Sequence, residues 1–236
     1  MSIAVSIDLE QDLPPYGSTF RGIEEGLPKI LAKLIKYDVN PTFFVTSDVA
    51  KRFPDEIENL IEHGFEIGCH SHYHKKSTNP NEIEEATHIL MDFCDVIGYR
   101  APYLRLNSNT YEYLHRLNYI YSSSTIGTHI RKVNGIIEVP ITPTKLFGLK
   151  LPACTSTLRL GGKRIIPRIL EREDIVFYTH PWEYIRLNHV RPRILGFRCG
   201  PWIEKIFDEF LKKAREIDDF KNLSYLAKYN AKRNQK

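Results

Sequence analysis

Short apolar segments alternate with longer amphipathic ones along this chain, and the alternation constrains the fold more than any other feature. The short segments are rich in β-branched and aromatic residues and predict strands at 3–7, 42–46, 65–69, 119–123, 136–139 and 175–179. Between them, apolar residues recur three and four positions apart and predict helices at 23–35, 55–63, 83–97 and 110–117. We expect Asn81 and Asn109 to cap the last two of these helices. Strand–helix alternation predicts parallel strands joined by crossover helices.

Two features favour a closed barrel over an open doubly wound sheet, which would show the same alternation. No Gly-x-Gly-x-x-Gly turn follows the first predicted strand, so the phosphate cradle of a dinucleotide-binding sheet is missing. In addition, Asp8, His70 and His180 each directly follow a predicted strand. A barrel builds its active site from residues at the carboxyl ends of several strands. The sequence therefore predicts an α/β fold, namely a distorted (β/α)7–8 barrel.

The chain is expected to form one domain. It holds no internal repeat, low-complexity segment or Gly/Ser linker, so residues 1–236 are assigned to a single barrel, with 218–236 as a peripheral C-terminal helix or tail. Residues 146–167 and 186–199 are expected to be insertions that shape the pocket. The hydrophobic fraction of 42% and the charged fraction of 26% are ordinary for a globular protein.

Charge and cysteine content limit the partners and the compartment. The net charge of +4 is spread along the chain, which favours a solvated surface over nucleic-acid binding. The four cysteines form no Cys-x-x-Cys pair, which favours reduced thiols and a cytoplasmic location. The N-terminus leads into the first strand with no signal-peptide pattern, and no stretch approaches the roughly 20 apolar residues of a membrane span. We expect no nucleic-acid or membrane partner, and a homo-oligomer is compatible with the sequence.

The clearest candidate for a metal site directly follows a predicted strand, in Cys69-His70-Ser71-His72-Tyr73-His74. In a turn or a first helical turn, positions i and i+4 face the same way, so His70 and His74 can bind one metal ion. His72 would point elsewhere. The alternative is a polar loop whose histidines only meet solvent.

Acidic residues at the end of the first predicted strand complete this candidate site. Asp8 and Glu10 lie two positions apart, a spacing that suits one acid as a metal ligand and one as a general base. Two histidines and a carboxylate leave a coordination position for water or substrate, as in catalytic zinc sites. Because histidine and carboxylate ligands suit zinc, Zn²⁺ is the expected cofactor.

Five short motifs follow one another along the chain: Ser6-Ile7-Asp8-Leu9-Glu10, Pro41-Thr42-Phe43-Phe44-Val45, His70-Ser71-His72-Tyr73-His74, Arg100-Ala101-Pro102-Tyr103 and Thr179-His180-Pro181-Trp182-Glu183. In this order they resemble the polysaccharide deacetylases, also called carbohydrate esterase family 4. The resemblance extends from the first strand to about Phe210. It implies a distorted β/α barrel that removes N-acyl groups with the help of a divalent metal ion.

The resemblance also implies catalytic and substrate-binding roles. Asp8 would be the general base, with Arg100 beside it to hold it ionised, and His180 would protonate the leaving amine. The backbone N–H of Tyr103 would stabilise the oxyanion. The implied substrate-binding residues are Tyr103, Pro102 and Trp182, of which the last would line the acyl pocket.

The implied metal ligands differ in one respect from the family pattern. His70 and His74 would bind the metal, with Glu10 as the third ligand and Asp12 as the less favoured substitute. In the family, the second acid of the first motif directly follows the base. Here that position is Leu9, and the acid comes one residue later.

A second departure concerns the catalytic histidine. The family's Tyr-Asp-Ser-Ser motif appears here as Tyr121-Ser122-Ser123-Ser124. Ser122 therefore replaces a carboxylate that orients the histidine in the family, and the orientation of His180 is left unexplained. The two departures keep open a catalytically impaired barrel that only binds its ligand.

Hydrolysis of an N-acyl group is the leading hypothesis, most simply the acetyl group of an amino sugar in a polysaccharide or glycoconjugate. The first alternative keeps the site and changes the substrate to a cyclic amide or ureide such as allantoin. The second alternative is the impaired, ligand-binding barrel. In the catalytic cases the expected partner is an N-acylated sugar or a small amide.

Overall fold

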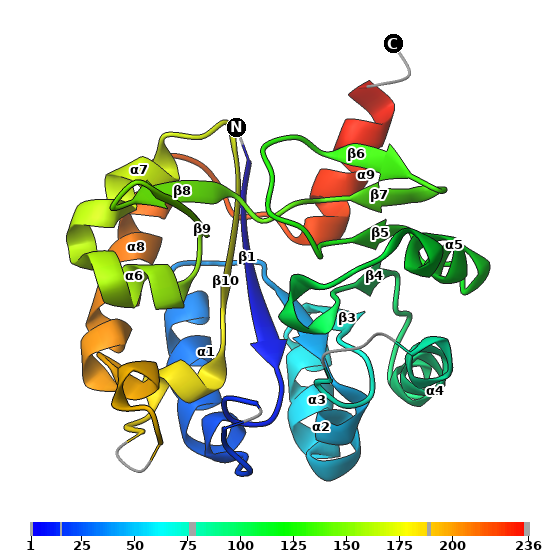
Figure 1. The fold of residues 1–236 in the computed structure, drawn as a ribbon, viewed down its shortest axis with the longest axis horizontal. Coiled ribbons are helices and arrows are strands. Elements are labelled where there is room, and N and C mark those ends of the chain that lie inside the picture. The colour runs from blue at the N-terminus through cyan, green and yellow to red at the C-terminus, as the bar shows by residue number, and fades with distance from the viewer. Residues whose placement is uncertain (1, 15, 76–78, 188–189, 234–236) are drawn as a thin grey trace.

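The computed structural model describes residues 2–14, 16–75, 79–187 and 190–233. Its main feature is an eight-stranded sheet in the order β10-β1-β2-β3-β4-β5-β7-β6 (Figure 1). Neighbouring strands in this sheet are parallel, except that β6 and β7 are antiparallel. The strands are Ser2–Leu9 (β1), Thr42–Val45 (β2), Glu66–Cys69 (β3), Gly98–Tyr99 (β4), Tyr121–Ser122 (β5), Arg131–Val133 (β6), Ile136–Glu138 (β7) and Asp174–Thr179 (β10).

The sheet curls into a half-barrel, and its register determines which residues meet at the carboxyl edge. Val45 lies opposite both Leu9 and Cys69, and Ile7 lies opposite Thr179. The residues that follow β3 and β10 therefore come to the same edge as the end of β1. The expected α/β fold, a distorted barrel of the (β/α)7–8 type, is confirmed.

The eight-residue strand β1 separates two hydrophobic cores. Its odd-numbered side chains pack toward the outer helices, namely Ile3, Val5, Ile7 and Leu9. Ala4 belongs instead to a smaller core on the other face of the sheet. Because successive side chains of a strand point to opposite faces, Asp8 and Glu10 lie on the same face as Ala4, inside the half-barrel.

Helices cover the outer face of the sheet (Figure 1). They are α1 Leu27–Lys36, α2 Ser47–Arg52, α3 Pro54–Glu62, α4 Pro80–Met91, α5 Ser108–Arg116, α6 Thr155–Gly161, α7 Ile166–Leu170 and α8 Pro201–Arg215. In α8, Phe207 and Phe210 are fully buried, and the ring of Phe210 stacks on Phe177 of β10 with centroids 4.3 Å apart. Over the described ranges, none of the helices has both the length and the apolar character that a membrane crossing requires.

The predicted helix at 23–35 is in fact divided. A π-helical turn, η1 (Gly22–Gly26), precedes α1 and packs against the 3-10 turn η4 (Pro181–Tyr184) that follows β10. A Cβ atom at Gly26 would lie 2.1 Å from the carbonyl oxygen of Pro181, so this close approach requires glycine. The helix is therefore divided where η1 packs closely against the turn that follows β10.

The boundaries of two other helices also differ from the prediction. The predicted helix at 83–97 ends at Met91, and the side chain of Asn79, not Asn81, caps its start. In α5 the cap is Asn107 rather than Asn109, and it accepts a hydrogen bond from the Thr110 N–H. The two helices therefore begin three and two residues earlier than the apolar periodicity indicates, because an N-cap side chain bonds two or three residues ahead.

The expected insertions contain regular structure that the sequence analysis missed. Two strands, β8 (Pro143–Leu146) and β9 (Leu149–Pro152), form a separate antiparallel hairpin. Residues 146–167 then continue through α6 and the 3-10 turn η3 (Gly162–Ile165). Residues 186–199 include the 3-10 turn η5 (Arg193–Gly196) and also residues 188 and 189, which lie outside the described residues.

The C-terminal segment includes the helix α9 (Leu223–Arg233). The side chains of Leu223, Leu226 and Ala227 are buried in the core inside the half-barrel, together with Ala4 and Phe44. The backbone N–H of Lys221 donates to Ile3 O at 2.9 Å, close to the amino end of β1. We therefore propose that α9 is an integral part of the barrel domain.

Leu226→Ala tests this role of α9. The side chain is 1% exposed, so the change should lower the free energy of unfolding by about 2–5 kcal/mol in denaturant titrations. The matched control is Lys228→Ala, on the exposed side of the same helix, which should leave the unfolding midpoint unchanged. Equal stability of Leu226→Ala and the parent protein would contradict the assignment.

Candidate functional site

A cleft of about 260 Å³ opens at the carboxyl ends of the strands. Its lining residues come from β1, from the loops after β1, β3 and β4, and from β10 and the turn that follows it. They are Asp8, Glu10, Leu13, Pro14, His70, His74, Ala101, Tyr103, Leu104, Tyr178, His180 and Trp182. The segments that carry chemistry in the sequence thus share one cleft.

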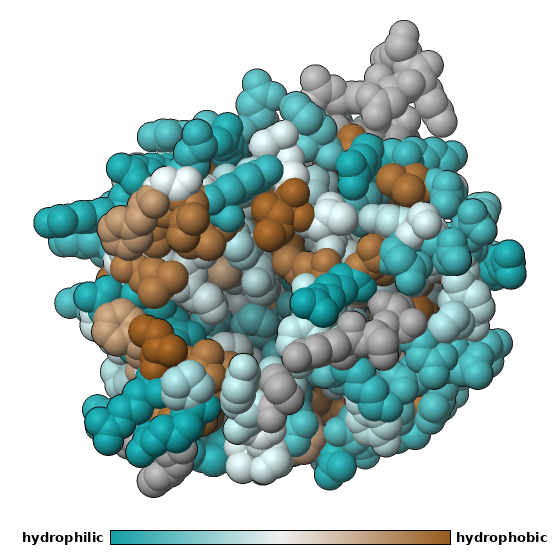
Figure 2. Space-filling model, in the orientation of Figure 1, coloured by the Kyte–Doolittle hydropathy of each residue, from teal (hydrophilic) through white to brown (hydrophobic). Residues whose placement is uncertain are grey.

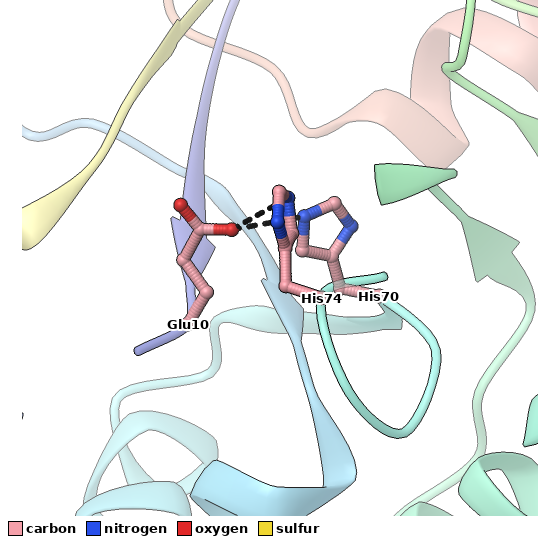
Figure 3. Close-up of side chains that lie close together, drawn as sticks. All are labelled: Glu10, His70 and His74. Carbon is pink, nitrogen blue, oxygen red and sulfur yellow. Dashed lines mark ion pairs between the residues drawn. The ribbon is translucent and has the colours of Figure 1, made fainter. Parts of the chain in front are cut away.

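Three lining residues, Glu10, His70 and His74, form a cluster that has the composition of a metal site (Figure 3). One potential ligand atom from each lies within 4.8 Å of the other two. Glu10 Oε2 is 2.7 Å from His74 Nε2 and 3.6 Å from His70 Nε2. Glu10 and His70 are buried, and His74 is nearly so.

Hydrogen bonding orients this cluster for a cation. His70 Nδ1 donates to the carbonyl oxygen of Arg100 at 2.7 Å, so its Nε2 carries the lone pair. Glu10 Oε2 and His70 Nε2 are buried atoms for which the described residues provide no hydrogen-bond partner. Burial acts to raise the pKa of Glu10, but electrostatic attraction to the neighbouring histidines, His74 first, holds it well below its usual range. An ionised carboxylate and imidazole lone pairs fit a divalent cation.

Two neighbouring residues lie outside the cluster. Asp12, the substitute third ligand, accepts hydrogen bonds from the Gly22 N–H at 2.8 Å and the Thr19 hydroxyl at 2.6 Å, which fix the loop after β1. His72 contacts the Ser47 hydroxyl through Nδ1 and points away from the cleft lining.

Asp8 forms a buried ion pair with Arg100. The guanidinium Nη1 is 2.6 Å from Asp8 Oδ1 and also donates to the Ser6 hydroxyl at 2.8 Å. Nε and Nη2 of Arg100 donate to the carbonyl oxygen and the hydroxyl of Ser123, each at 2.9 Å. The Arg100 side chain is fully buried over the ring of Phe44. Asp8 Oδ2 remains directed toward His180, with 3.9 Å to its Nε2.

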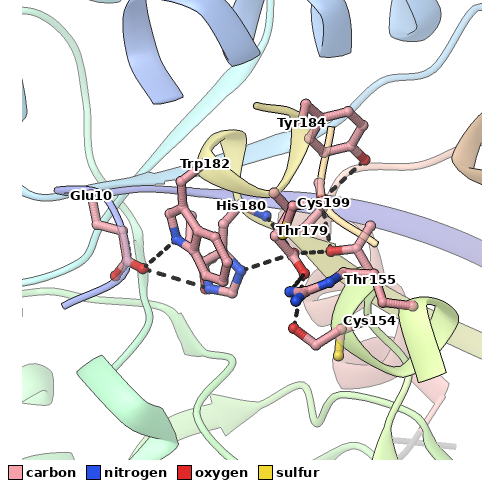
Figure 4. A network of polar contacts seen from close by, with 12 residues as sticks. Glu10, Cys154, Thr155, Thr179, His180, Trp182, Tyr184 and Cys199 are labelled. Atoms are coloured by element: carbon pink, nitrogen blue, oxygen red, sulfur yellow. Dashed lines mark hydrogen bonds and ion pairs between the residues drawn. The ribbon is translucent and has the colours of Figure 1, made fainter. Parts of the chain in front are cut away.

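A hydrogen bond and a stacked aromatic ring fix the orientation of His180. Its Nδ1 donates to Glu183 Oε2 at 3.3 Å, and the ring of Trp182 stacks on it with centroids 4.9 Å apart (Figure 4). The Trp182 indole N–H donates to Glu10 Oε1 at 3.2 Å. The ring stacked on His180 is therefore hydrogen-bonded to the Glu10–His70–His74 cluster. His180 Nε2 therefore faces Asp8 and Glu10.

Glu183 is held by residues that the sequence analysis did not single out. It is fully buried and accepts hydrogen bonds from Thr155, from the Ser156 hydroxyl at 2.9 Å and from Arg159 Nη1 at 3.0 Å. All three donors lie on α6, within the expected insertion at 146–167. Glu183 lies three residues after His180, in η4, and this spacing brings both side chains together in a helical turn. The spacing was the one signal in the sequence that could have predicted the contact between Glu183 and His180.

These contacts change the protonation of both groups. Burial by itself lowers the pKa of His180, but the hydrogen bond to Glu183 and the charges of Glu10, Glu183 and Asp8 raise it to about 9. Burial acts to raise the pKa of Glu183, whereas His180 and Arg159 lower it to about 2. The pair is therefore an imidazolium and a carboxylate at neutral pH.

The remaining candidates surround the cleft in different ways. Tyr103 lines it beside His74, with ring centroids 4.3 Å apart, and its φ of +56° is a left-handed value rarely adopted by a residue with a side chain. Trp182 is 5% exposed and also lines the cleft. Pro102 is buried in the turn before Tyr103 and is not among the lining residues.

The two departures from the motif pattern have clear positions. Leu9 is fully buried in the outer core, on the face of β1 opposite Asp8 and Glu10. Ser122 is fully buried, and its hydroxyl is 2.8 Å from that of Ser124, which accepts a hydrogen bond from the Ala101 N–H. Ser122 thus belongs to a hydroxyl network behind the Arg100 loop.

Comparison with known proteins gives partial matches to polysaccharide deacetylases. The family model for "Polysaccharide deacetylase" matches residues 14–122 of this chain. A peptidoglycan-N-acetylglucosamine deacetylase from Bacillus cereus is 35% identical over 66 residues. That alignment spans 28% of this chain and 24% of the relative.

Solved structures share the fold over nearly the whole chain. A Mycobacterium smegmatis protein assigned to the polysaccharide deacetylases has a TM-score of 0.73 and 18% identity over 98% of this chain and 91% of its own. Puue allantoinase has a TM-score of 0.69 and 14% identity, covering 96% of this chain and 89% of its own. A carbohydrate esterase family 4 pseudoenzyme from Bacillus anthracis has a TM-score of 0.62 and 14% identity, covering 96% and 65%.

The segment matched by the family model carries the end of β3, with His70 and His74, and the Arg100 loop. The ends of β1 and β10, with Asp8, Glu10 and His180, lie outside that segment and within the fold shared with the solved structures. These comparisons show that residues 14–122 match the polysaccharide deacetylase family model and that nearly the whole chain shares the fold of solved structures.

Proposed function

We propose that this chain is a metal-dependent hydrolase that removes an N-acyl group, most simply acetyl, from an amino sugar. One observation carries the proposal. The Glu10, His70 and His74 cluster shares a cleft with Asp8 and His180, whose nearest side-chain atoms are 3.9 Å apart. Amide hydrolysis needs a cation site with a base and an acid beside it. The match of residues 14–122 to the polysaccharide deacetylase family model supports the same class of reaction.

Glu10, His70 and His74 are the proposed ligands of a divalent cation, and two imidazoles with one carboxylate suit zinc. When bound, such an ion supplies Lewis acidity that polarises an acyl carbonyl and eases deprotonation of water. The hydrogen bond from His70 Nδ1 to the Arg100 carbonyl supports this assignment, because it leaves the Nε2 lone pair on the side of Glu10.

Asp8 is the proposed general base. Arg100 occupies its Oδ1, so Oδ2 accepts the proton of the attacking water on the side of the cleft. The guanidinium is itself fixed by Ser6 and Ser123, which keeps the carboxylate in one orientation. A base that needs no rearrangement during the reaction lowers the barrier.

His180 is the proposed general acid, and Glu183 its positioning residue. The leaving nitrogen of an amide must be protonated as the tetrahedral intermediate collapses, and the imidazolium Nε2 faces the cleft for this step. Glu183 orients the ring through Nδ1 and stabilises its protonated form. It thereby takes the place of the family carboxylate whose position is Ser122 in this chain.

The backbone N–H of Tyr103 is the proposed oxyanion donor. Strained backbone at a cleft is retained where it aims a group, and the positive φ of Tyr103 supports such a role. Pro102 fixes the turn that presents Tyr103, and the Trp182 ring closes the cleft beside the acyl group.

A cleft of about 260 Å³ suits the N-acyl end of one sugar residue, and its size also supports a second candidate. A cyclic amide or ureide such as allantoin is small enough to enter the same space. Both reactions use the same base, acid and cation, so only substrate turnover separates them.

Amine release from N-acetylated chito-oligosaccharides tests the function directly, with allantoin hydrolysis measured in parallel. With zinc present, the protein should deacetylate the oligosaccharides, and Asp8→Asn should reduce kcat at least about 100-fold because the general base is lost. Asp12→Asn is the matched control and should keep kcat within about threefold. Turnover of allantoin alone would favour the ureide. No turnover of either, with zinc bound and no effect of Asp8→Asn, would identify a ligand-binding barrel.

Zinc binding tests the ligand set independently of turnover. Isothermal titration should give one site per chain, and His74→Ala should weaken zinc binding at least about tenfold because one of three ligands is removed. His72→Ala is the matched control, because His72 lies two residues from each proposed histidine ligand but contacts Ser47 instead of the cluster, and this variant should bind zinc like the parent protein. Equal loss of affinity in both variants would contradict the assignment of the ligands.

The pH dependence of kcat tests the pairing of His180 with Glu183. A proton donor with a pKa of about 9 is active at neutral pH, and activity should fall as the pH rises through that value. Glu183→Gln removes the charge that stabilises the imidazolium, so the basic limb should move to lower pH and kcat should fall more than KM changes. Ser156→Ala keeps the Glu183 charge and should keep the limb in place. An unmoved limb in Glu183→Gln would exclude this role.

A further inference from the structure

A second concave surface lies away from the catalytic cleft. It has a volume of about 720 Å³ and is formed by the β8–β9 turn, the α6–η3–α7 segment and α8. The two lining sets share no residue. We call this surface the basic groove, because five cations line it: Lys163, Arg164, Arg168, Arg198 and Lys205.

The charge of the basic groove is not neutralised within the described part of the protein. None of its five cations forms an ion pair with an acid among those residues. The acid in its lining, Glu209, is 3.2 Å from Lys213. Arg198 is held over the ring of Trp202 and donates to the Arg159 carbonyl at 3.0 Å, so its charge has a fixed position. The surface is therefore suited to an anionic partner.

Exposed apolar side chains stand at the edge of the same groove. Phe147 in the β8–β9 turn and Leu160 on α6 line the groove and are 86% and 48% exposed, and Leu149, the first residue of β9, is 64% exposed. Figure 2 shows apolar side chains gathered over β8, β9 and α6, with hydrophilic ones around them. An apolar patch bordered by charge marks an interaction surface.

The backbone conformation of the β8–β9 turn is unusual for the residue at its first position. Phe147 and Gly148 have φ values of +51° and +79°, a conformation for which the first position of a two-residue hairpin turn usually holds Asn, Asp or Gly. Phe is poorly suited to this backbone, and its side chain, being mostly exposed, gains little from packing. A large apolar residue kept at such a position indicates a contact made outside the chain.

We propose that the basic groove and the β8–β9 turn dock on the surface of an anionic phospholipid membrane. Phe147 and Leu149 would enter the boundary between headgroups and acyl chains, while the cations contact the lipid phosphates. A soluble phosphate or a nucleic acid would use the cations but leave the apolar turn in water, so the membrane accounts for both features. The inference does not depend on the proposed hydrolase activity, and it revises the expectation of no membrane partner.

Cosedimentation of the full chain with vesicles tests the proposal. The protein should bind vesicles of equal parts phosphatidylglycerol and phosphatidylcholine, should not bind pure phosphatidylcholine, and should bind less as salt rises. Lys163→Ala with Arg164→Ala should weaken binding about 25-fold, or about fivefold for each cation removed. Phe147→Ser should weaken it at least about tenfold through lost apolar insertion.

Two control variants carry similar substitutions on surfaces away from the basic groove. Ile35→Ser on α1, where the side chain is 56% exposed, and Lys132→Ala on β6 should bind vesicles like the parent protein. No binding to the anionic vesicles at low salt would overturn the proposal, as would equal weakening by the control changes. Unchanged binding in Phe147→Ser, or full release from vesicles by inorganic phosphate at matched ionic strength, would instead identify a site for soluble phosphate and also overturn it.

Discussion

The structure depends on how three buried carboxylates, Asp8, Glu10 and Glu183, are paired with basic groups. Asp8 is paired with Arg100, and Glu183 with Arg159, so each has a guanidinium partner. Glu10 is equally buried, but within the described residues its ion-pair partners are histidines. A buried carboxylate is costly unless a positive charge is nearby. Either protonated histidine or a bound cation can supply that charge, and a cation also engages the buried His70 Nε2, which lacks a hydrogen-bond partner among the described residues.

The geometry of β1 explains why the acids stand two positions apart. Residues i and i+2 of a strand face the same side, so Asp8 and Glu10 enter the cleft together and Leu9 packs in the outer core. The sequence departure at Leu9 is therefore compatible with a complete site. The departure at Ser122 has a similar explanation. In the proposed roles, Glu183, in the turn after β10, contacts His180 and takes the place of the carboxylate that the family motif has at position 122.

Much of this arrangement could be predicted from the sequence, because strands with near-continuous apolar residues and polar ends leave a strong local pattern. The cleft residues Asp8, His70 and His180 were found this way, since each follows such a strand directly. The Glu183 network could not be found, because Thr155, Ser156 and Arg159 lie more than twenty residues before the acid and have no local pattern that links them to it. The two-residue strand β4 was missed because it is too short to show a period. The hairpin β8–β9 was missed because Lys145 and Lys150 interrupt the apolar residues of its strands.

Anomalous diffraction at the zinc edge, from crystals grown with zinc, tests the central claim most directly. The account predicts one strong peak per chain within about 2.0–2.2 Å of a Glu10 oxygen and of one imidazole nitrogen each from His70 and His74. A peak coordinated by Asp12 in place of Glu10, or saturating zinc with no peak among these three side chains, would contradict it.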